Sequence, residues 1–268
     1  MSNTVSLKID AGVATVTLRH TGKFNAMSRL MWRELRAVFE TLQQRTDLFG
    51  VLVRGEDGHF CAGGDISEYT SFRFDEAGLR DFHENDVWGG LSAMLACDLP
   101  IVAQIEGNCM GAGVEIASCC DIRIAADSAR FGAPIAKLGF PMAPREAALV
   151  MRAVGELTAR EMLLAAAVLD ATEMKQRGFL NQVVPADEVA VAAQLRVQRI
   201  SQLAPQAARM NKAALRTLAP VPHGPAVAQL IASAYDYANS AEHHEGIAAF
   251  MDKRPPQFQA GMAEPHIL

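Results

Sequence analysis

Two glycine-rich turns carry the residue types that are best suited to chemistry in this chain. The first turn spans residues 60–66 (FCAGGDI) and the second spans residues 107–115 (GNCMGAGVE). In both turns, small residues follow an apolar run and precede a segment with helical periodicity, so the first backbone amides of that segment lack intrahelical partners. Two such amides that point at one oxygen form an oxyanion hole, which stabilises negative charge on a carbonyl oxygen.

Glu115 adds an acid/base group to the second turn. It follows Ala112 by three residues and so lies about one turn into the expected helix. Because helical side chains lean toward the helix N-terminus, its carboxylate can point back toward the amide donors. A lone glutamate in a first helical turn is more commonly there because the helix dipole favours it. The two glycine turns in this order favour the catalytic role, since an acid/base group beside an oxyanion hole makes a reaction centre.

Strands and helices must alternate to position these turns. Residues 5–18 alternate apolar and polar side chains around Ala11 and Gly12, which predicts a hairpin. Apolar runs predict buried strands at 50–55, 100–105 and 121–125, and helical spacing predicts helices at 28–44, within 76–96, and after residues 145, 189 and 205. The first two of these strands lead directly into the glycine turns. This alternation predicts an α/β fold with parallel strand pairing.

Length and composition predict a protein with a full core. The chain has 268 residues, of which 50% are hydrophobic and 21% are charged. The proline-rich residues 220–225 interrupt the last helical region. We therefore expect a core with the active site at residues 1–200 and a helical region at residues 201–268.

Charge and targeting patterns exclude several classes of function. The net charge of −5, the pI near 5.8 and the lack of a basic stripe predict no nucleic-acid partner. The chain begins without a charged and apolar leader, and no apolar run approaches the ~18 residues of a membrane span. We expect a cytoplasmic protein with no membrane partner. The five cysteines include no Cys-x-x-Cys pair, which predicts reduced thiols and no metal site.

Several ordered segments together resemble the crotonase superfamily, which includes enoyl-CoA hydratases and isomerases. Besides the two turns, they are residues 23–28 (KFNAMS), 129–132 (ARFG) and 242–258, the last resembling a C-terminal helix pair. The resemblance implies a spiral core of ββα turns with a C-terminal helical trimerisation region, and a homotrimer or homohexamer. It also implies an enzyme of fatty acid metabolism that acts on acyl- or enoyl-CoA thioesters. Coenzyme A would then be part of the substrate, and no cofactor would be permanently bound.

The same resemblance assigns roles to individual residues. The amides of Gly64 and Ala112 would bind the thioester oxygen, and Glu115 would be the acid/base. Carbonyl groups near Ala26, Ala62 and Ile66 would hold the adenine. The expected coenzyme A-binding set is Ala26, Ala62, Gly64, Asp65, Ile66 and Ala112, in which Asp65 is expected to brace the helix that follows it.

One position departs from the family pattern in a way that affects the reaction. Family hydratases usually carry a second acid directly after the proline of the loop that follows Phe-Gly, and this chain has Ile135 there. Ile135 cannot relay a proton, so double-bond isomerisation or another enolate reaction suits Glu115 alone better than hydration, unless Glu146 replaces the missing acid. Desolvation beside Ile135 would raise the pKa of Glu115.

The coenzyme A phosphates lack their usual basic partner. Family members often have a lysine just after the Asp-Ile pair of the first turn, where this chain has Ser67. Arg29, Arg54 and Lys253 are the candidates to replace it.

Other titratable residues have plainer interpretations. His243, His244 and Glu245 are adjacent in a predicted helix and diverge by about 100° each, so they predict a solvated face and not a metal site. Cys61 and Cys109 are expected to be small packing residues. Either His59 or His83 could reach the pocket, and residues 69–88 are expected to shape the acyl tunnel.

Two other functions remain open at this point. A coenzyme A-binding protein without catalysis is compatible with Ile135, although Glu115 argues against it. A dinucleotide-binding oxidoreductase would use the second turn, but residues 107–113 have the spacing G-x-x-x-G-x-G and not G-x-G-x-x-G.

Overall fold

The computed structural model describes residues 3–219 and 224–258, and its main sheet has six strands in the order β1-β2-β3-β4-β6-β9. The strands are β1 (Asn3–Asp10), β2 (Val13–His20), β3 (Gly50–Gly55), β4 (Ile101–Ile105), β6 (Ile122–Ala126) and β9 (Gln182–Val184). The hairpin partners β1 and β2 are antiparallel, and the other pairings of this sheet are parallel. The predicted hairpin, α/β class and parallel sheet are confirmed.

A second, smaller sheet holds the second glycine turn. Its strands are β5 (Asn108–Met110), β7 (Arg130–Gly132) and β8 (Val168–Asp170), with β7 in the middle. Strand β5 pairs in parallel with β7, and β7 pairs antiparallel with β8. The turn that carries Glu115 is therefore anchored by backbone hydrogen bonds before its helix begins.

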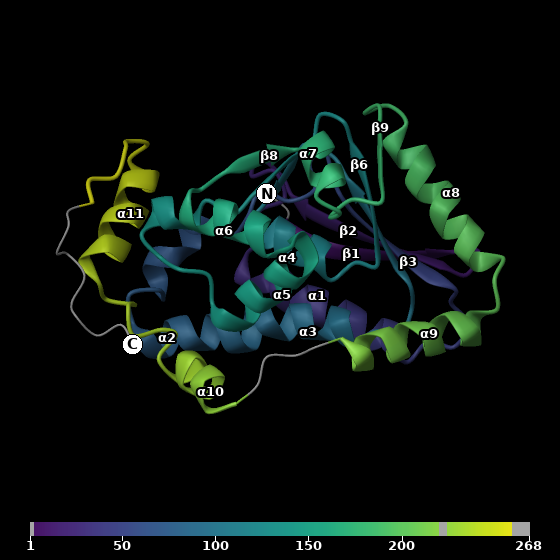
Figure 1. Cartoon of the computed structure of the whole chain (residues 1–268), viewed down its shortest axis with the longest axis horizontal. Helices are drawn as coiled ribbons and strands as arrows, with labels where there is room; N and C mark the ends of the chain where they lie inside the picture. The colour runs from purple at the N-terminus through teal and green to yellow at the C-terminus, as the bar shows by residue number, and fades with distance from the viewer. Residues whose placement is uncertain (1–2, 220–223, 259–268) are drawn as a thin grey trace.

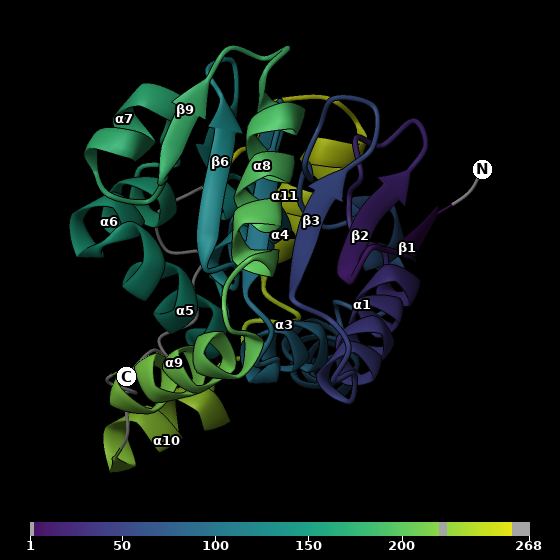
Figure 2. The ribbon, with the colours of Figure 1, turned by 90° about the vertical axis from the view of Figure 1, so that its right-hand side faces the viewer.

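Helices surround the main sheet (Figures 1 and 2). They are α1 (Arg29–Gln43), α2 (Glu76–Asp81), α3 (Trp88–Ala96), α4 (Ala112–Ser118), α5 (Pro144–Val154), α6 (Glu156–Leu164), α7 (Ala171–Gln176), α8 (Val189–Ser201), α9 (Pro205–Leu218), α10 (Pro225–Ala232) and α11 (Ala241–Met251). Two short 3₁₀ helices, η1 (Ile66–Ser71) and η3 (Ile135–Leu138), and a π-helical segment at Phe82–Val87 complete the list. The predicted N-cap Ser28 is confirmed, since its Oγ accepts a hydrogen bond from the Met31 amide at 3.2 Å.

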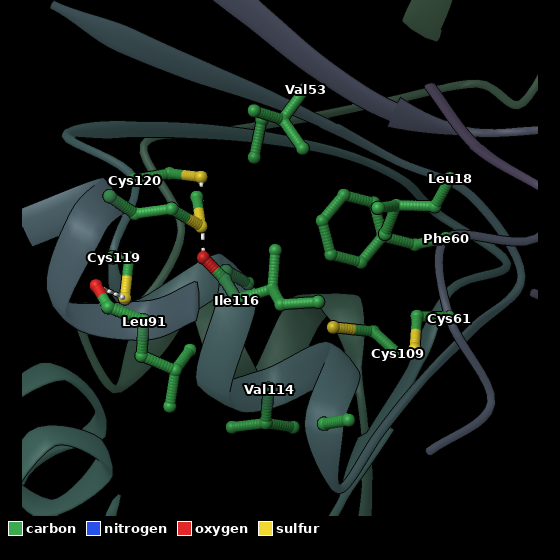
Figure 3. Packing of buried hydrophobic residues seen from close by; sticks show 14 of the residues in the cluster. Leu18, Val53, Phe60, Cys61, Leu91, Cys109, Val114, Ile116, Cys119 and Cys120 are labelled. Carbon is green, nitrogen blue, oxygen red and sulfur yellow. Dashed lines mark hydrogen bonds between the residues drawn. The ribbon is translucent and has the colours of Figure 1, made fainter. Parts of the chain in front are cut away.

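The two faces of the main sheet are covered differently. Helix α8 lies across one face, as Figure 2 shows, and packs Ala193 and Val197 against Leu52 and Val102 of the strands. The larger core lies on the other face, where α1, α3 and α4 contribute buried side chains. Every residue of α4 is buried, and Figure 3 shows its Val114 and Ile116 among buried side chains from several other elements. The helix that carries Glu115 is therefore fixed from all sides.

The C-terminal helices reach back to the active-site side of the molecule. Helix α11 packs against η1, which follows the first glycine turn, and against η3, which begins at Ile135. The predicted helix pair at 242–258 is wrong within the described residues, because α11 ends at Met251 and the chain is not helical from there to residue 258. Of the proline-rich interruption, residues 220–223 lie outside the described residues, between the end of α9 and the start of α10.

Candidate active site

The two glycine turns lie directly against each other. The Cys61 amide donates to the Asn108 carbonyl at 2.9 Å, and the Met110 amide donates to the Cys61 carbonyl at 2.9 Å. The backbones approach so closely that a Cβ on Gly113 would lie 2.5 Å from the Cys61 carbonyl oxygen. A Cβ on Gly111 would lie 3.6 Å from the Gly63 Cα. Glycine is required at Gly113 because this approach leaves no room for a side chain.

The amides of Gly64 and Ala112 are both unused by the described protein. Around Gly64, the Met27 amide donates to the Gly63 carbonyl and the Asp65 amide donates to the Met27 carbonyl, each at 2.8 Å. This parallel bridge engages both neighbours of the Gly64 amide and leaves that amide without an acceptor among residues 3–219 and 224–258. Ala112 is the first residue of α4, and its amide likewise has no acceptor there. Both nitrogens thus remain available to a ligand oxygen.

Glu115 is buried one turn into α4. Burial, followed by the nearby charge of Glu146, raises the pKa of Glu115 well above its ordinary value, while Arg73 opposes the shift. The predicted direction of the shift is confirmed, but the neighbour that contributes to it is a second carboxyl group and not only an apolar surface. Neither oxygen of Glu115 accepts a hydrogen bond from the described residues.

Glu146 is the second carboxyl group. It lies in the first turn of α5, which packs against α4, and its Oε1 is 2.8 Å from Nδ1 of His83. Burial raises the pKa of Glu146 to about 8, and Arg73 lowers it in part. Two buried carboxyl groups that repel each other's charge favour a shared state in which one is protonated and the other is ionised.

His83 comes from the π-helical segment that interrupts the helix between α2 and α3. Burial lowers its pKa well below the ordinary value, so the imidazole is neutral and carries one N–H. Its ring stacks on Tyr235 with centroids 5.6 Å apart. When Glu146 is protonated it donates to Nδ1, and the ring proton is then on Nε2. When Glu146 is ionised, Nδ1–H donates to it instead. His83 Nε2 has no hydrogen-bond partner among the described residues.

Arg73 provides a buried positive charge beside these groups. Its exposed fraction is 1%, and its guanidinium lies over the rings of Tyr69 and Phe140, 4.3 Å and 4.0 Å from their centroids. Its hydrogen-bond acceptors are neutral: Nε donates to His243 at 3.4 Å and Nη2 to Tyr237 at 3.2 Å. One positive charge beside two carboxyl groups again favours a site in which one carboxyl group is ionised.

Tyr69 completes the site and was not singled out in the sequence beyond its place in the expected acyl tunnel. A Cβ on Gly64 would overlap with the Tyr69 hydroxyl, so the phenol lies against the backbone of the first turn. Burial raises the pKa of Tyr69 to about 12, which keeps the hydroxyl a neutral donor. The sequence gives no sign that this tyrosine belongs to the site, because the direction of its side chain depends on the path of η1.

The polar ends of these side chains border accessible space. Among the described residues, His83 Nε2 is the single fully buried side-chain polar atom without a partner. The oxygens of Glu115, the Tyr69 hydroxyl and Arg73 Nη1 also have no protein partner there, and they are not fully buried. They therefore reach space that a water-sized molecule can enter.

The other residues predicted to bind coenzyme A differ in how many hydrogen bonds they already make within the protein. Asp65 caps η1 through the Ser67 amide and also pairs with Lys23 at 2.7 Å, so its predicted bracing role is confirmed. The Ala26 carbonyl accepts a hydrogen bond from the His20 ring at 2.6 Å, which leaves it one lone pair for a ligand. The Ala62 carbonyl accepts no hydrogen bond from the described residues. Ile66 begins η1.

The candidate phosphate-binding residues differ in availability. Arg29 is bound to Asp81 and Asp86 at 2.6 Å and 2.5 Å, so its charge is already compensated. Arg54 donates to Thr17 at 3.3 Å. Lys253 is exposed just after α11.

Several of the plainer predictions can now be assessed. The cysteines are free and buried, and burial raises the pKa of Cys61 to about 12, which confirms a packing role. His59 Nδ1 accepts a hydrogen bond from the Asn108 amide at 3.1 Å. The predicted solvated face at 243–245 is wrong for His243, which is fully buried and accepts from Arg73, because Arg73 needs a neutral acceptor there.

Residues 3–219 and 224–258 contain neither a metal-binding cluster nor a membrane-spanning helix. No group of three or more His, Cys, Asp or Glu residues could hold a metal ion. No helix in this part of the chain combines the length and apolar character needed to cross a bilayer.

Comparison with known proteins finds similar sequences and structures over most of the chain. The family model described as enoyl-CoA hydratase/isomerase matches residues 8–261. A probable enoyl-CoA hydratase of Mycobacterium bovis is 32% identical over 95% of this chain and 97% of its own length. The 2,3-dehydroadipyl-CoA hydratase of Escherichia coli is 30% identical over 92% of this chain and 95% of its own. A crystal structure of an enoyl-CoA hydratase/carnithine racemase from Magnetospirillum magneticum is 34% identical, with a TM-score of 0.78 over 96% of this chain and 95% of that one.

Proposed function

Because the chain belongs to the enoyl-CoA hydratase/isomerase family and has the crotonase fold that its sequence predicted, we propose that it catalyses the reversible hydration of a 2-enoyl-CoA thioester. The observation that carries this proposal is the second buried carboxyl group, Glu146, which lies on α5, the helix that packs against the helix of Glu115. Hydration needs one group to take a proton from water and another to deliver a proton to carbon. Glu146 supplies the acid that Ile135 cannot.

The thioester carbonyl oxygen is proposed to accept hydrogen bonds from the amides of Gly64 and Ala112. When water attacks the β carbon, the electron pair of the double bond moves through the α carbon to this oxygen and forms an enolate. Both donors are held by rigid backbone and need no rearrangement as the charge develops. A single donor of this kind typically contributes about 100- to 1,000-fold to the rate.

The two carboxyl groups are proposed to divide the proton transfers. Glu146 is the base that takes the proton from the attacking water, and Glu115 is the acid that protonates the α carbon. Two observations support this division. Burial and then the charge of Glu146 raise the pKa of Glu115 well above its ordinary value, which favours a protonated Glu115. His83 Nδ1 lies 2.8 Å from Glu146 Oε1 and can donate its proton to that carboxylate when Glu146 is ionised. In the reverse reaction the roles exchange, so the same pair catalyses dehydration.

His83 and Tyr69 are proposed to act around this pair. His83 positions Glu146 through the 2.8 Å hydrogen bond at Nδ1. The Tyr69 hydroxyl, which lies against Gly64, is close to the expected thioester oxygen and is a neutral donor. Coenzyme A enters as part of the substrate, with its adenine near the carbonyls of Ala26, Ala62 and Ile66.

Enzyme assays with matched substrates test the proposal. Purified protein is incubated with a 2-enoyl-CoA or a 3-enoyl-CoA, and the absorbance of the conjugated thioester is followed. We expect loss of absorbance with the 2-enoyl-CoA. Glu115→Gln and Glu146→Gln should each lower the hydration rate by about 100- to 10,000-fold. Glu40→Gln, which removes an exposed carboxylate on α1, is the control and should leave the rate unchanged.

The competing reactions give different results in the same assays. Isomerisation with Glu115 alone predicts that the 3-enoyl-CoA gains absorbance and that Glu146→Gln leaves this reaction intact. Full hydration activity in Glu146→Gln would contradict the role of the second carboxyl group. Binding of coenzyme A thioesters without turnover of either substrate would favour a non-catalytic homologue.

A further inference from the structure

Arg73 has no carboxylate partner although it is almost completely buried. Within the described residues, no Asp or Glu oxygen lies within 4.0 Å of its guanidinium, while other buried charges are paired, such as Asp86 with Arg29. Its acceptors are one imidazole nitrogen and one phenol oxygen. An arginine offers five N–H donors in a fixed fork that fits the two oxygens of a carboxylate.

The contacts that do hold Arg73 compensate for only part of its lost hydration. Burial of an ionised side chain costs several kcal/mol unless a charged partner is present. The faces of Tyr69 and Phe140 supply cation–π attraction, at 4.3 Å and 4.0 Å, and orient the flat guanidinium between them. This sandwich leaves the edge of the guanidinium, where Nη1 lies, as the part that can meet a ligand. Nη1 has no protein acceptor among the described residues and is not fully buried.

Tyr69 connects this free edge to the proposed oxyanion donors. Its hydroxyl lies against Gly64 and the face of its ring lies under Arg73. The guanidinium is therefore about one tyrosine side chain away from the first glycine turn. These two contacts of Tyr69 set the arginine near the proposed thioester site. An acyl chain that starts at the thioester oxygen meets Arg73 within a few carbon atoms.

We propose that the acyl group of the natural substrate is short and ends in a carboxylate, which binds to the free edge of Arg73. This inference rests on the proposed coenzyme A-thioester function and names its substrate class. The carboxylate of the substrate supplies the directly bound counter-charge that no Asp or Glu of the described residues provides. His83 Nε2, which is fully buried and has no partner among the described residues, offers a second donor when its proton is on that nitrogen. The aromatic walls exclude water and strengthen the ion pair.

Binding of unreactive thioesters tests the proposal without requiring turnover. Glutaryl-CoA and pentanoyl-CoA have five acyl carbons each and differ in whether the last is a carboxylate or a methyl group. We expect calorimetry on the wild-type protein to give a Kd for glutaryl-CoA that is about 10- to 100-fold lower. In Arg73→Met this preference should disappear or reverse, whereas Arg36→Met, an exposed control on α1, should keep it.

The possible outcomes separate this proposal from the proposed function. Equal affinities of wild-type protein for the two thioesters, or a preference that survives in Arg73→Met, would overturn the carboxylate site while leaving hydration of neutral substrates intact. Failure of both thioesters to bind would overturn the carboxylate site and the proposed function together. If Arg73→Met does not fold, Arg73→Lys keeps the charge and loses the planar fork, and the preference should fall in it. In the kinetic assay, a 2-enoyl-CoA with a terminal carboxylate should show a kcat/KM at least about tenfold above that of its methyl counterpart.

Discussion

Replacement of Glu146 by glutamine should stabilise the protein above neutral pH. Burial raises the pKa of Glu146 from an ordinary 4.5 to about 8. Between these values the native state binds a proton that the unfolded state has released, so the free energy of unfolding falls as pH rises. The slope is about 1.4 kcal/mol per pH unit for one such group. Glutamine removes this contribution because it has no proton to lose.

The pH range in which this effect can be measured is narrower, because His83 changes the free energy of unfolding in the opposite direction at lower pH. Burial lowers the pKa of His83, so below about 6.5 the unfolded state binds a proton that the native state does not. This contribution makes stability rise with pH until about 6.5 and then ends. From pH 6.5 to pH 8 the Glu146 contribution remains, which amounts to about 2 kcal/mol over about 1.5 pH units. Glu115 contributes with the same sign, since its pKa is raised as well.

Urea unfolding, followed by circular dichroism at pH 6.5 and at pH 8 and at several protein concentrations, measures the difference. We expect wild-type protein to lose at least about 2 kcal/mol across this interval and Glu146→Gln to lose clearly less. The loss of stability in Glu146→Gln is smaller also because the pKa of Glu115 falls when the charge of Glu146 is removed. Glu40→Gln, which lacks only an exposed ion pair, should follow wild type. Equal pH slopes in wild type and Glu146→Gln would refute the coupled buried pair.

Three further predictions concern the turns, the thiols and the assembly. Gly64→Ala should lower turnover by about 100-fold, because the new Cβ would overlap with the Tyr69 hydroxyl and displace the proposed donor amide. The double variant Gly64→Ala/Tyr69→Phe should recover part of the lost rate. Full activity in Gly64→Ala would contradict the oxyanion role. A thiol reagent should leave the native protein unmodified and label its five cysteines after unfolding, since all are buried; rapid native labelling of Cys61 would count against this packing. Analytical ultracentrifugation should give a species heavier than the 28.9 kDa chain. The reason is that α9 exposes Leu215 and Leu218, which would be buried in an interface between subunits. A monomer at micromolar concentration would exclude the expected trimer or hexamer.

Local signals in the sequence were enough to predict much of the fold and the proposed oxyanion turns. The strand at Gly50–Gly55 has the bounds that its apolar run predicts, and Ser28 caps the helix that it precedes. These features depend on neighbours in sequence, such as a glycine at a turn or a hydroxyl before a helix. The contact between the two turns needs glycine at Gly113, and the sequence displays that glycine directly.

The polar side of the site could not be predicted in the same way, because its members stabilise one another across long sequence separations. His83 contacts Glu146 from 63 residues away, and Arg73 meets His243 from 170 residues away. A charged or imidazole side chain is read as exposed when considered alone, since burial without a partner is costly. The prediction for His243 failed for this reason: its partner is itself a buried cation, in the turn between η1 and α2. Arg73, next to two phenylalanines in the sequence, likewise gives no sign that aromatic faces will enclose it. Residues that are buried only because they contact one another can therefore be identified from the fold but not from the sequence. Arg73 is one of them: its neutral partners allow it to be buried, but they leave its charge for a substrate carboxylate to balance.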